Sequence, residues 1–483
     1  MPALNTPPNA PFKRSDFLRL LLVSPFYWMM LLLIVEAGLA AATTALIIQA
    51  SHDVSQQEFL ITDFVWIVAA QSASYIVGAS SWIFAERAGF GAYGRYMSRF
   101  AKDNRRQTAL LGDREQREQV EPFLTNETFH TLFELIYELE ADFKLFFSLL
   151  FNTIVLGYAI DAGLPIVYAF VFVSLLILQW FVRKPVAAAY LAQQRETNRM
   201  TAHTYTAWDN ITTGNRYNYR LWNGGFKERL RGALKAQIRA IMARETIATV
   251  SGIFALIVVF SYLAWVAGRN VGDSALLIAL AATLPRQIDL SYNVHGLASG
   301  WNDLLAVWTR MGGVCAAMRP APDAQFNQRI HFEGVSLARG SEVLPCSNVD
   351  VAAHQVLAQP TGRILVRGGN GMGKSSLLVA LKARFGSEAF YWPTSDKLSF
   401  SFLKGQENDD ESEENALSSN GFSSGEKQMR SLQEISAKTQ AKVYLLDEWD
   451  ANLDSKNRAL AEQIVSGLAA RAVVVEISHR DRV

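Results

Sequence analysis

Long apolar runs constrain the fold of this chain more than any other feature. Six of them approach or exceed the ~20 residues with which a helix crosses a bilayer: Pro25 to Ala50, Ile61 to Phe84, Phe143 to Ile160, Leu164 to Val182, Ile247 to Ala267 and Ser274 to Leu284. Pro285 interrupts the last run, which a Pro kink inside a longer helix continuing to about Met318 would explain. A cleaved signal is the alternative for the first run, but that run extends to Ala50, past the ~7 to 15 residues of a signal core. The sequence predicts six membrane spans.

Lys and Arg residues predict the orientation of these spans. Lys13, Arg14 and Arg19 precede the first run, and two long basic connections follow the second and fourth runs. The connections after the first and third runs, 51–60 and 161–163, contain neither residue type. By the positive-inside rule both termini are cytoplasmic.

Composition excludes several other kinds of protein. The formal net charge is +1 over 483 residues, so there is no global basic field for nucleic acid. The two cysteines, Cys315 and Cys346, are too few for a disulfide framework and wrongly spaced for a metal site, which indicates reduced cytoplasmic thiols. The lipid bilayer is the expected partner, and nucleic acid is not.

The chain divides into four expected parts. Residues 1–14, rich in Pro, form a disordered tail, 15–318 a transmembrane domain with six spans, and 319–329 a linker. Residues 330–483 follow, in which strand-like pieces at 330–337, 363–366, 443–446 and 473–477 alternate with helical stretches. This alternation is typical of an α/β domain with a mainly parallel sheet. A helix running unbroken from Ile61 to about Gln107 would be roughly 70 Å long and would project into the cytoplasm.

A glycine-rich segment of the last part fits the phosphate-binding pattern GxxxxGK[ST]. It lies between a strand and the helical stretch from Ser375 to Phe385. Its backbone N–H groups would wrap phosphates, Lys374 would reach the β- and γ-phosphates, and Ser375 would ligate Mg²⁺. A glycine-rich turn arising by chance is the alternative. The residues expected to bind ATP here are Gly368, Gly369, Asn370, Gly371, Met372, Gly373, Lys374, Ser375 and Ser376.

A second chemical feature ends the strand at 443–446, where Asp447 and Glu448 follow directly. A buried Asp at the end of such a strand can hold Mg²⁺, and a neighbouring carboxylate can position or deprotonate the attacking water. Alone such a pair is mostly structural, whereas downstream of a P-loop it indicates nucleotide hydrolysis. The predicted fold is therefore an all-α membrane bundle of six helices with long cytoplasmic helix extensions, followed by a shortened α/β P-loop ATPase domain.

Three further segments occur in the order found in one known family. Phe422 to Gln428 is similar to the ABC signature, Ala451 to Asp454 to the D-loop, and Ile477 to Arg480 to the switch-histidine segment. With the P-loop and the spans, they make the chain resemble an ABC half-transporter of the exporter (type IV) fold, in the bacterial peptide-transporter branch. This resemblance implies a protein of the bacterial inner membrane.

The resemblance implies roles for particular residues. Glu448 would be the catalytic base and His479 the γ-phosphate sensor, while Lys374 would act on the transferred phosphate. Ser423, Gly425 and Asp454 would contact ATP across a dimer, so a homodimer is expected. The implied activity is ATP-driven translocation, most simply export, of a small amphipathic or peptide-like substrate. The alternatives are a membrane-anchored regulatory ATPase that does not pump, and one half of a heterodimer.

The chain also departs from the family pattern. Ser376 and Ser423 are closer together than is usual, Thr394 stands where a glutamine is expected unless Gln406 replaces it, and no adenine-stacking aromatic lies near 338–340. By the same resemblance, coupling helices that meet the ATPase would fall at 113–123 and 205–219. Simple packing of the helices is the alternative for both.

Ionisable residues near the third and sixth runs are the candidates for substrate contact. Glu134, Glu138 and Asp142 recur every four residues, so on a helix they form one acidic stripe. Arg286, Asp289 and His295 follow Pro285 within an apolar pattern. Ionisable groups at membrane depth normally face a protein interior or a watery cavity, which predicts a cationic or strongly polar substrate. A solvated face below the membrane is the alternative for the stripe.

Overall fold

The computed structural model describes residues 12–57, 61–105, 107–320, 326–393, 398–404, 423–451 and 453–478. The chain forms two compact units. One, the helical unit, comprises Met1–Arg99 and Pro122–Met318, and the other, the sheet unit, comprises Phe100–Glu121 and Arg319–Val483.

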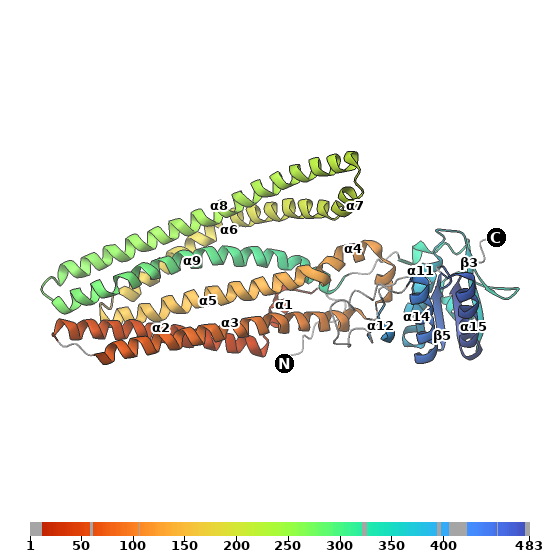
Figure 1. The fold of residues 1–483 in the computed structure, drawn as a ribbon, viewed down its shortest axis with the longest axis horizontal. Coiled ribbons are helices and arrows are strands. Elements are labelled where there is room, and N and C mark those ends of the chain that lie inside the picture. The colour runs from red at the N-terminus through yellow and green to blue at the C-terminus, as the bar shows by residue number, and fades with distance from the viewer. Residues whose placement is uncertain are drawn as a thin grey trace. The chain divides into compact units, whose positions relative to one another are not determined.

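Long helices lying side by side build the helical unit (Figure 1). The helices α6 and α8 are joined through the short α7 into a hairpin. The expected long helix starting at Ile61 is confirmed, since α3 continues without a break to Asn104. The expected Pro within a longer last helix is confirmed as well, because α9 contains Pro285. The elements are α1 (Arg14–Leu21), α2 (Ser24–Ser55), α3 (Ile61–Asn104), a π-helical turn (Phe123–Glu127), α5 (Thr128–Ala159), α6 (Leu164–Thr204), α7 (Ala207–Thr212), α8 (Arg216–Arg269) and α9 (Ser274–Met318).

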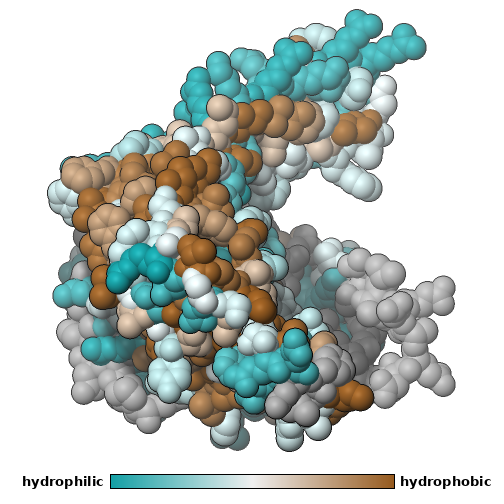
Figure 2. Space-filling model, turned by 90° about the vertical axis from the view of Figure 1, so that its left-hand side faces the viewer, coloured by the Kyte–Doolittle hydropathy of each residue, from teal (hydrophilic) through white to brown (hydrophobic). Residues whose placement is uncertain are grey.

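Four of the described helices, α2, α3, α6 and α8, are long and apolar enough to cross a membrane. Large apolar side chains on these helices point outward, and Trp66, Ile76 and Ile166 are 64%, 69% and 71% exposed. Apolar side chains cover much of the face drawn in Figure 2, while its projecting upper part is largely hydrophilic. Exposed apolar surface of this extent suits lipid rather than water.

The fold class predicted from the sequence, a bundle of six membrane helices followed by an α/β P-loop ATPase domain, is wrong. Four described helices rather than six have the length and hydropathy of a span. The third and sixth predicted runs lie in α5 and α9, where Asp142 and Lys144 lie at the start of one run and Arg286 and Asp289 follow the end of the other. The two units do not follow one another along the chain either, because residues 100–121 belong to the second.

The sheet also differs from the predicted, mainly parallel one. It is a small mixed sheet with six described strands in the order β2-β1-β3-β6-β5-β4, in which β1 runs antiparallel to both its neighbours. The strands predicted at 363–366, 443–446 and 473–477 are confirmed, whereas β2 and β4 were not predicted. The strands are β1 (Val335–Arg339), β2 (Glu342–Leu344), β3 (Gly362–Gly368), β4 (Ala389–Trp392), β5 (Val443–Asp447) and β6 (Val473–Ile477).

Helices cover both faces of the sheet, so its central strands are buried on both sides. In β5, Val443 and Leu445 pack into one apolar core, and Tyr444 and Leu446 pack into the other. The described helices of this unit are α4 (Arg114–Pro122), α10 (Val349–Leu357), α11 (Lys374–Phe385), α12 (Ser401–Lys404), α14 (Ser424–Lys438) and α15 (Ser455–Arg471), with short 3-10 turns at Thr108–Gly112, Phe326–Arg329 and Gly386–Glu388.

A segment from the first half of the chain completes the sheet unit. The nearly fully buried Arg319 and Asp103 side chains form an ion pair at 2.7 Å. Arg329 Nη1 donates to the carbonyl of Gly112 at 2.9 Å. A Cβ on Gly112 would collide with the Phe326 ring, so glycine is needed for this approach. These contacts explain why residues 100–121 fold with the sheet although the helical sequence surrounds them.

Candidate functional site

The glycine-rich loop connects the end of β3 to the start of α11, which is the context that a phosphate-binding loop requires. Gly371 and Gly373 have φ angles of +80° and +86°, which residues with a side chain rarely adopt. A Cβ on Gly373 would also collide with the carbonyl oxygen of Arg329. The backbone of the loop is thus held in a shape that depends on glycine.

Lys374 is the first residue of α11, and its ammonium group folds back over the loop. Its Nζ donates to the carbonyl oxygens of Gly368 at 2.7 Å and Gly369 at 3.1 Å. The positive charge therefore lies where the N-terminus of the helix also favours an anion.

Ser375, on the next position of α11, reaches across to the end of β5. Its Oγ donates to Asp447 Oδ1 at 3.1 Å, and the Tyr391 hydroxyl at the end of β4 donates to the other carboxylate oxygen at 3.3 Å. Parallel pairing of β4 with β5 puts Tyr391 opposite Leu445, which brings the two side chains to the same end of the sheet. The structure thus joins Lys374, Ser375 and Asp447 in one place.

The Asp447 carboxyl group is 5% exposed. Burial raises its pKa to about 6, the neighbouring Glu448 raises it further, and the hydrogen bonds from Ser375 and Tyr391 act in the opposite direction. Burial beside this carboxylate also raises the pKa of the Tyr391 hydroxyl. A hydroxyl and a carboxylate oxygen are ligands that Mg²⁺ accepts, and Mg²⁺ usually combines few protein ligands with substrate phosphates. The described residues contain no group of three His, Cys, Asp or Glu that could hold a metal ion.

Glu448 occupies a strained position. Its φ angle is +49°, and its N–H donates to the Ile477 carbonyl at 3.1 Å. The Gln428 amide of α14 donates to the carbonyl oxygens of Glu448 and Trp449 at 3.4 and 2.6 Å. A strained residue whose backbone is held from two sides is typical of a position with a functional role.

A buried polar network supports this turn from below. Trp449 Nε1 donates to Glu476 Oε2 at 2.8 Å, and Arg363 pairs with the same carboxylate at 2.7 Å. Glu476 is 3% exposed, and burial raises its pKa while Arg363 lowers it. The Asp447–Trp449 turn is therefore fixed to strands β3 and β6.

The signature-like and D-loop-like segments supply helix caps. The Ser423 hydroxyl accepts from the N–H of Glu426, whose side chain accepts in turn from the N–H of Ser423. Gly425 lies in the first turn of the same helix, α14, and Asp454 caps α15 by accepting from the N–H of Asn457 at 2.7 Å. Four predicted positions, Thr394, Gln406, Asn452 and His479, lie outside the described residues.

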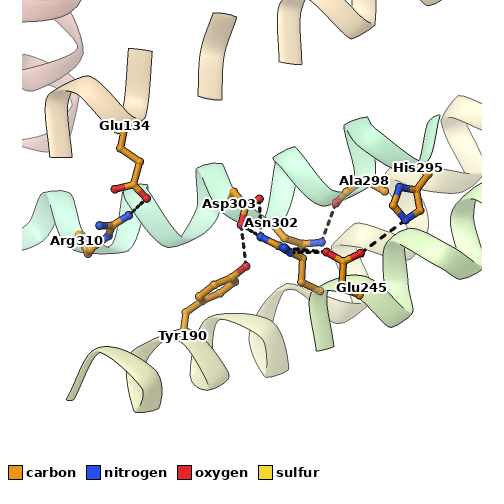
Figure 3. A network of polar contacts seen from close by, with 9 residues as sticks. Glu134, Tyr190, Glu245, His295, Ala298, Asn302, Asp303 and Arg310 are labelled. Carbon is orange, nitrogen blue, oxygen red and sulfur yellow. Dashed lines mark hydrogen bonds and ion pairs between the residues drawn. The ribbon is translucent and has the colours of Figure 1, made fainter. Parts of the chain in front are cut away.

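The helical unit contains a polar cavity of about 440 Å³ between α5, α6, α8 and α9. Figure 3 shows the polar network along it. Arg244 donates to both oxygens of Asp303 at 3.0 and 3.1 Å, and the Tyr190 hydroxyl donates to Asp303 at 3.0 Å. Arg310 pairs with Glu134 across α9 and α5.

A second cavity, of about 580 Å³, lies between α2, α3, α5 and α9. Arg286 and Asp289 of α9 line it. We call it the inner cavity, because the parts of α2 and α3 that line it belong to their apolar runs.

The structure separates the predicted substrate residues instead of joining them. Glu138 lines the polar cavity, and Arg286 and Asp289 line the inner cavity. Asp142 packs directly over Gly300 of α9, and His295 lies 3.8 Å from Glu245. The acidic stripe on α5 therefore faces α9 along its length.

Sequence reasoning missed Tyr391 and Glu476, since nothing in the local pattern links them to the P-loop, and it included Gln428 only as the last residue of the signature-like segment. It also missed Glu36, Glu140 and Lys144 in the inner cavity. Glu36 did carry a signal, as the one charged side chain within the apolar run from Pro25 to Ala50, and such residues mark functional positions by default.

Comparison with known proteins adds no assignment, because no family model and no curated protein matches this chain.

Proposed function

We propose that this protein is an ATP-hydrolysing membrane transporter that works as an ABC half-transporter does, as a homodimer. It would move a small amphipathic or peptide-like substrate, most simply outward, across a bacterial inner membrane with both termini in the cytoplasm. The observation that carries the proposal is the contact of Ser375 with Asp447 beside Lys374, in a chain that also has four helices able to span a membrane.

The geometry suits phosphoryl transfer, in which catalysis is mostly positioning and charge stabilisation. The Lys374 ammonium and the N–H groups of the loop would bind the β- and γ-phosphates of ATP. Ser375 and Asp447 would hold Mg²⁺, which neutralises phosphate charge when it is bound with the nucleotide. Glu448, one residue after Asp447, would orient the attacking water and accept its proton.

The homodimer rests on the signature-like segment. Ser423 and Gly425 lie at the N-terminus of α14, an end of a helix that favours anions. In the family that the chain resembles, this segment acts on the ATP of the opposite subunit. One such segment per chain then requires two chains.

The departures from the family pattern favour two alternative functions, a regulatory ATPase and one half of a heterodimer. A regulatory ATPase would hydrolyse ATP without moving a substrate. Arg339 lies where the family has an aromatic residue that stacks on adenine, and it donates a hydrogen bond to Gln359. This difference favours altered binding of the nucleotide base. One half of a heterodimer would lack hydrolysis when purified alone.

Membrane vesicles of the two orientations distinguish these functions. Inverted and right-side-out vesicles with the full-length protein would be given Mg-ATP and a labelled amphipathic peptide. An exporter accumulates the peptide only in inverted vesicles. Hydrolysis without uptake in either orientation would favour the regulator, and absent hydrolysis in the purified homodimer would favour the heterodimer.

A further inference from the structure

The inner cavity lies beside the apolar runs of α2 and α3, two of the described helices that are able to span a membrane. Glu36 lines it from α2, about eleven residues into the apolar run that begins at Pro25, which at ~1.5 Å per residue is close to the middle of a ~30 Å bilayer core. Glu140 and Lys144 line it from α5, and Arg286 and Asp289 from α9. Five ionisable side chains thus converge where ionised groups are expensive.

Both cations of the inner cavity already have partners in the protein. Lys144 Nζ lies 2.8 Å from Glu36 Oε1. Arg286 donates to Asn152 Oδ1 at 3.1 Å and to the carbonyl of Ala40 at 3.3 Å. Neither cation requires an anionic ligand to be stabilised.

The carboxylates of the cavity are less well partnered. Glu36, Glu140 and Asp289 line the cavity together with Lys144 and Arg286, so the formal charges leave one negative charge in excess; Asp289 is exposed, whereas Glu36 and Glu140 are not. Glu36 Oε2 is buried and has no hydrogen-bond partner. Glu140 is 5% exposed, and its described hydrogen bond comes from the Ser81 hydroxyl at a long 3.5 Å.

A buried carboxylate is stable only when it is paired and hydrogen-bonded. A hydrogen-bond donor with a positive charge would satisfy both conditions in this cavity. Leu33, Tyr75 and Leu145 line the same space and would accept an apolar body. A volume of about 580 Å³ lies in the range of sites for drug-sized ligands.

We propose that the inner cavity binds the ammonium group of an amphipathic amine, such as the free N-terminus of a short apolar peptide, through Glu36, Glu140 and Asp289. The proposal rests on the transport function proposed above and gives the chemical class of its substrate. A neutral apolar compound would leave the excess carboxylate unpaired.

Binding of a defined probe tests this directly. The full-length protein in nanodiscs, without nucleotide, would be titrated with tryptophanyl-leucinamide, which has one ammonium group, and with its N-acetylated form, which has none. We expect the free amine to bind at least tenfold more tightly than the acetylated form, because a charge-assisted hydrogen bond to a buried carboxylate is lost. Equal affinities would overturn the proposal.

Charge-removing variants locate the site. Glu140→Gln and Asp289→Asn keep the size of each side chain and should each weaken amine binding at least tenfold. Glu196→Gln, which removes an exposed carboxylate paired with Arg199, is the matched control and should bind as wild type. Gel filtration would detect a variant that does not fold, and the second variant then still tests the site. Unchanged amine binding in a folded variant would show that the amine binds elsewhere.

The outcomes for the site and for the pump can be separated. Because the titration contains no nucleotide, amine binding together with absent ATP hydrolysis would contradict only the transport function. ATP-driven uptake that persists without amine selectivity would contradict only the site.

Discussion

The raised pKa of the Asp447 carboxyl group predicts that nucleotide binding depends on pH. Mg²⁺ binds the ionised carboxylate, whereas burial raises the pKa of this carboxyl group to about 6. The ionised fraction is about nine-tenths at pH 7 and about one-tenth at pH 5. Since only the ionised form can bind Mg²⁺, the apparent Kd for Mg-ATP should rise about tenfold when the pH falls from 7 to 5.

The measurement is a fluorescence titration of the purified full-length protein with a labelled ATP analogue and Mg²⁺ from pH 5 to pH 7.5. The phosphates of the nucleotide also titrate in this range, so Asp447→Asn, which has no such carboxyl group, measures their share. Tyr391→Phe removes a hydrogen bond that lowers the pKa of Asp447 and should move the transition to higher pH. A wild-type affinity that follows the pH curve of Asp447→Asn would refute the assignment.

Three further variants test the site and the helix packing. Gly373→Ala should weaken ATP binding more than Gly371→Ala, because both have positive φ angles but only a Cβ at Gly373 collides with backbone; equal effects in the titration would contradict this. Gly300→Val should lower the thermal unfolding midpoint in detergent by a few degrees, through overpacking against Asp142, while the control Gly268→Val, whose Cβ meets open space, should not. Glu448→Gln should keep ATP bound and stall turnover as a dimer, and light scattering that finds only monomers at saturating ATP would contradict the dimer.

Much of the candidate nucleotide site follows from local sequence. A strand followed by glycines, a lysine and a helix can be predicted because this pattern is local, and the structure places that loop between β3 and α11, with positive φ angles at Gly371 and Gly373. The partners of Asp447 were predicted only in part. Ser375 belongs to the motif, whereas Tyr391 reaches Asp447 through the pairing of β4 with β5, which no local pattern specifies.

The architecture was less predictable, for physical reasons. Residues 100–121 join the sheet unit through the pairing of Asp103 with Arg319, a contact between distant parts of the chain. Hydropathy alone counted α5 and α9 as spans, although charged side chains lie at the ends of their apolar runs. Helical spacing put Glu138 and Asp142 on one face, but the packing of α5 against α9 separates them: Glu138 lines the polar cavity and Asp142 packs over Gly300.

ATP hydrolysis by the wild type and by Lys374→Ala, measured side by side, tests the central claim most directly. Phosphate release from the purified, reconstituted full-length protein would be followed with Mg-ATP. Exposed Lys442, which pairs with Glu388 away from the loop, provides the control variant Lys442→Ala. The account predicts Mg²⁺-dependent hydrolysis that Lys442→Ala retains and that Lys374→Ala reduces by at least about a hundredfold, since the variant loses the positive charge that stabilises the transferred phosphate. Hydrolysis by Lys374→Ala at the wild-type rate would contradict it.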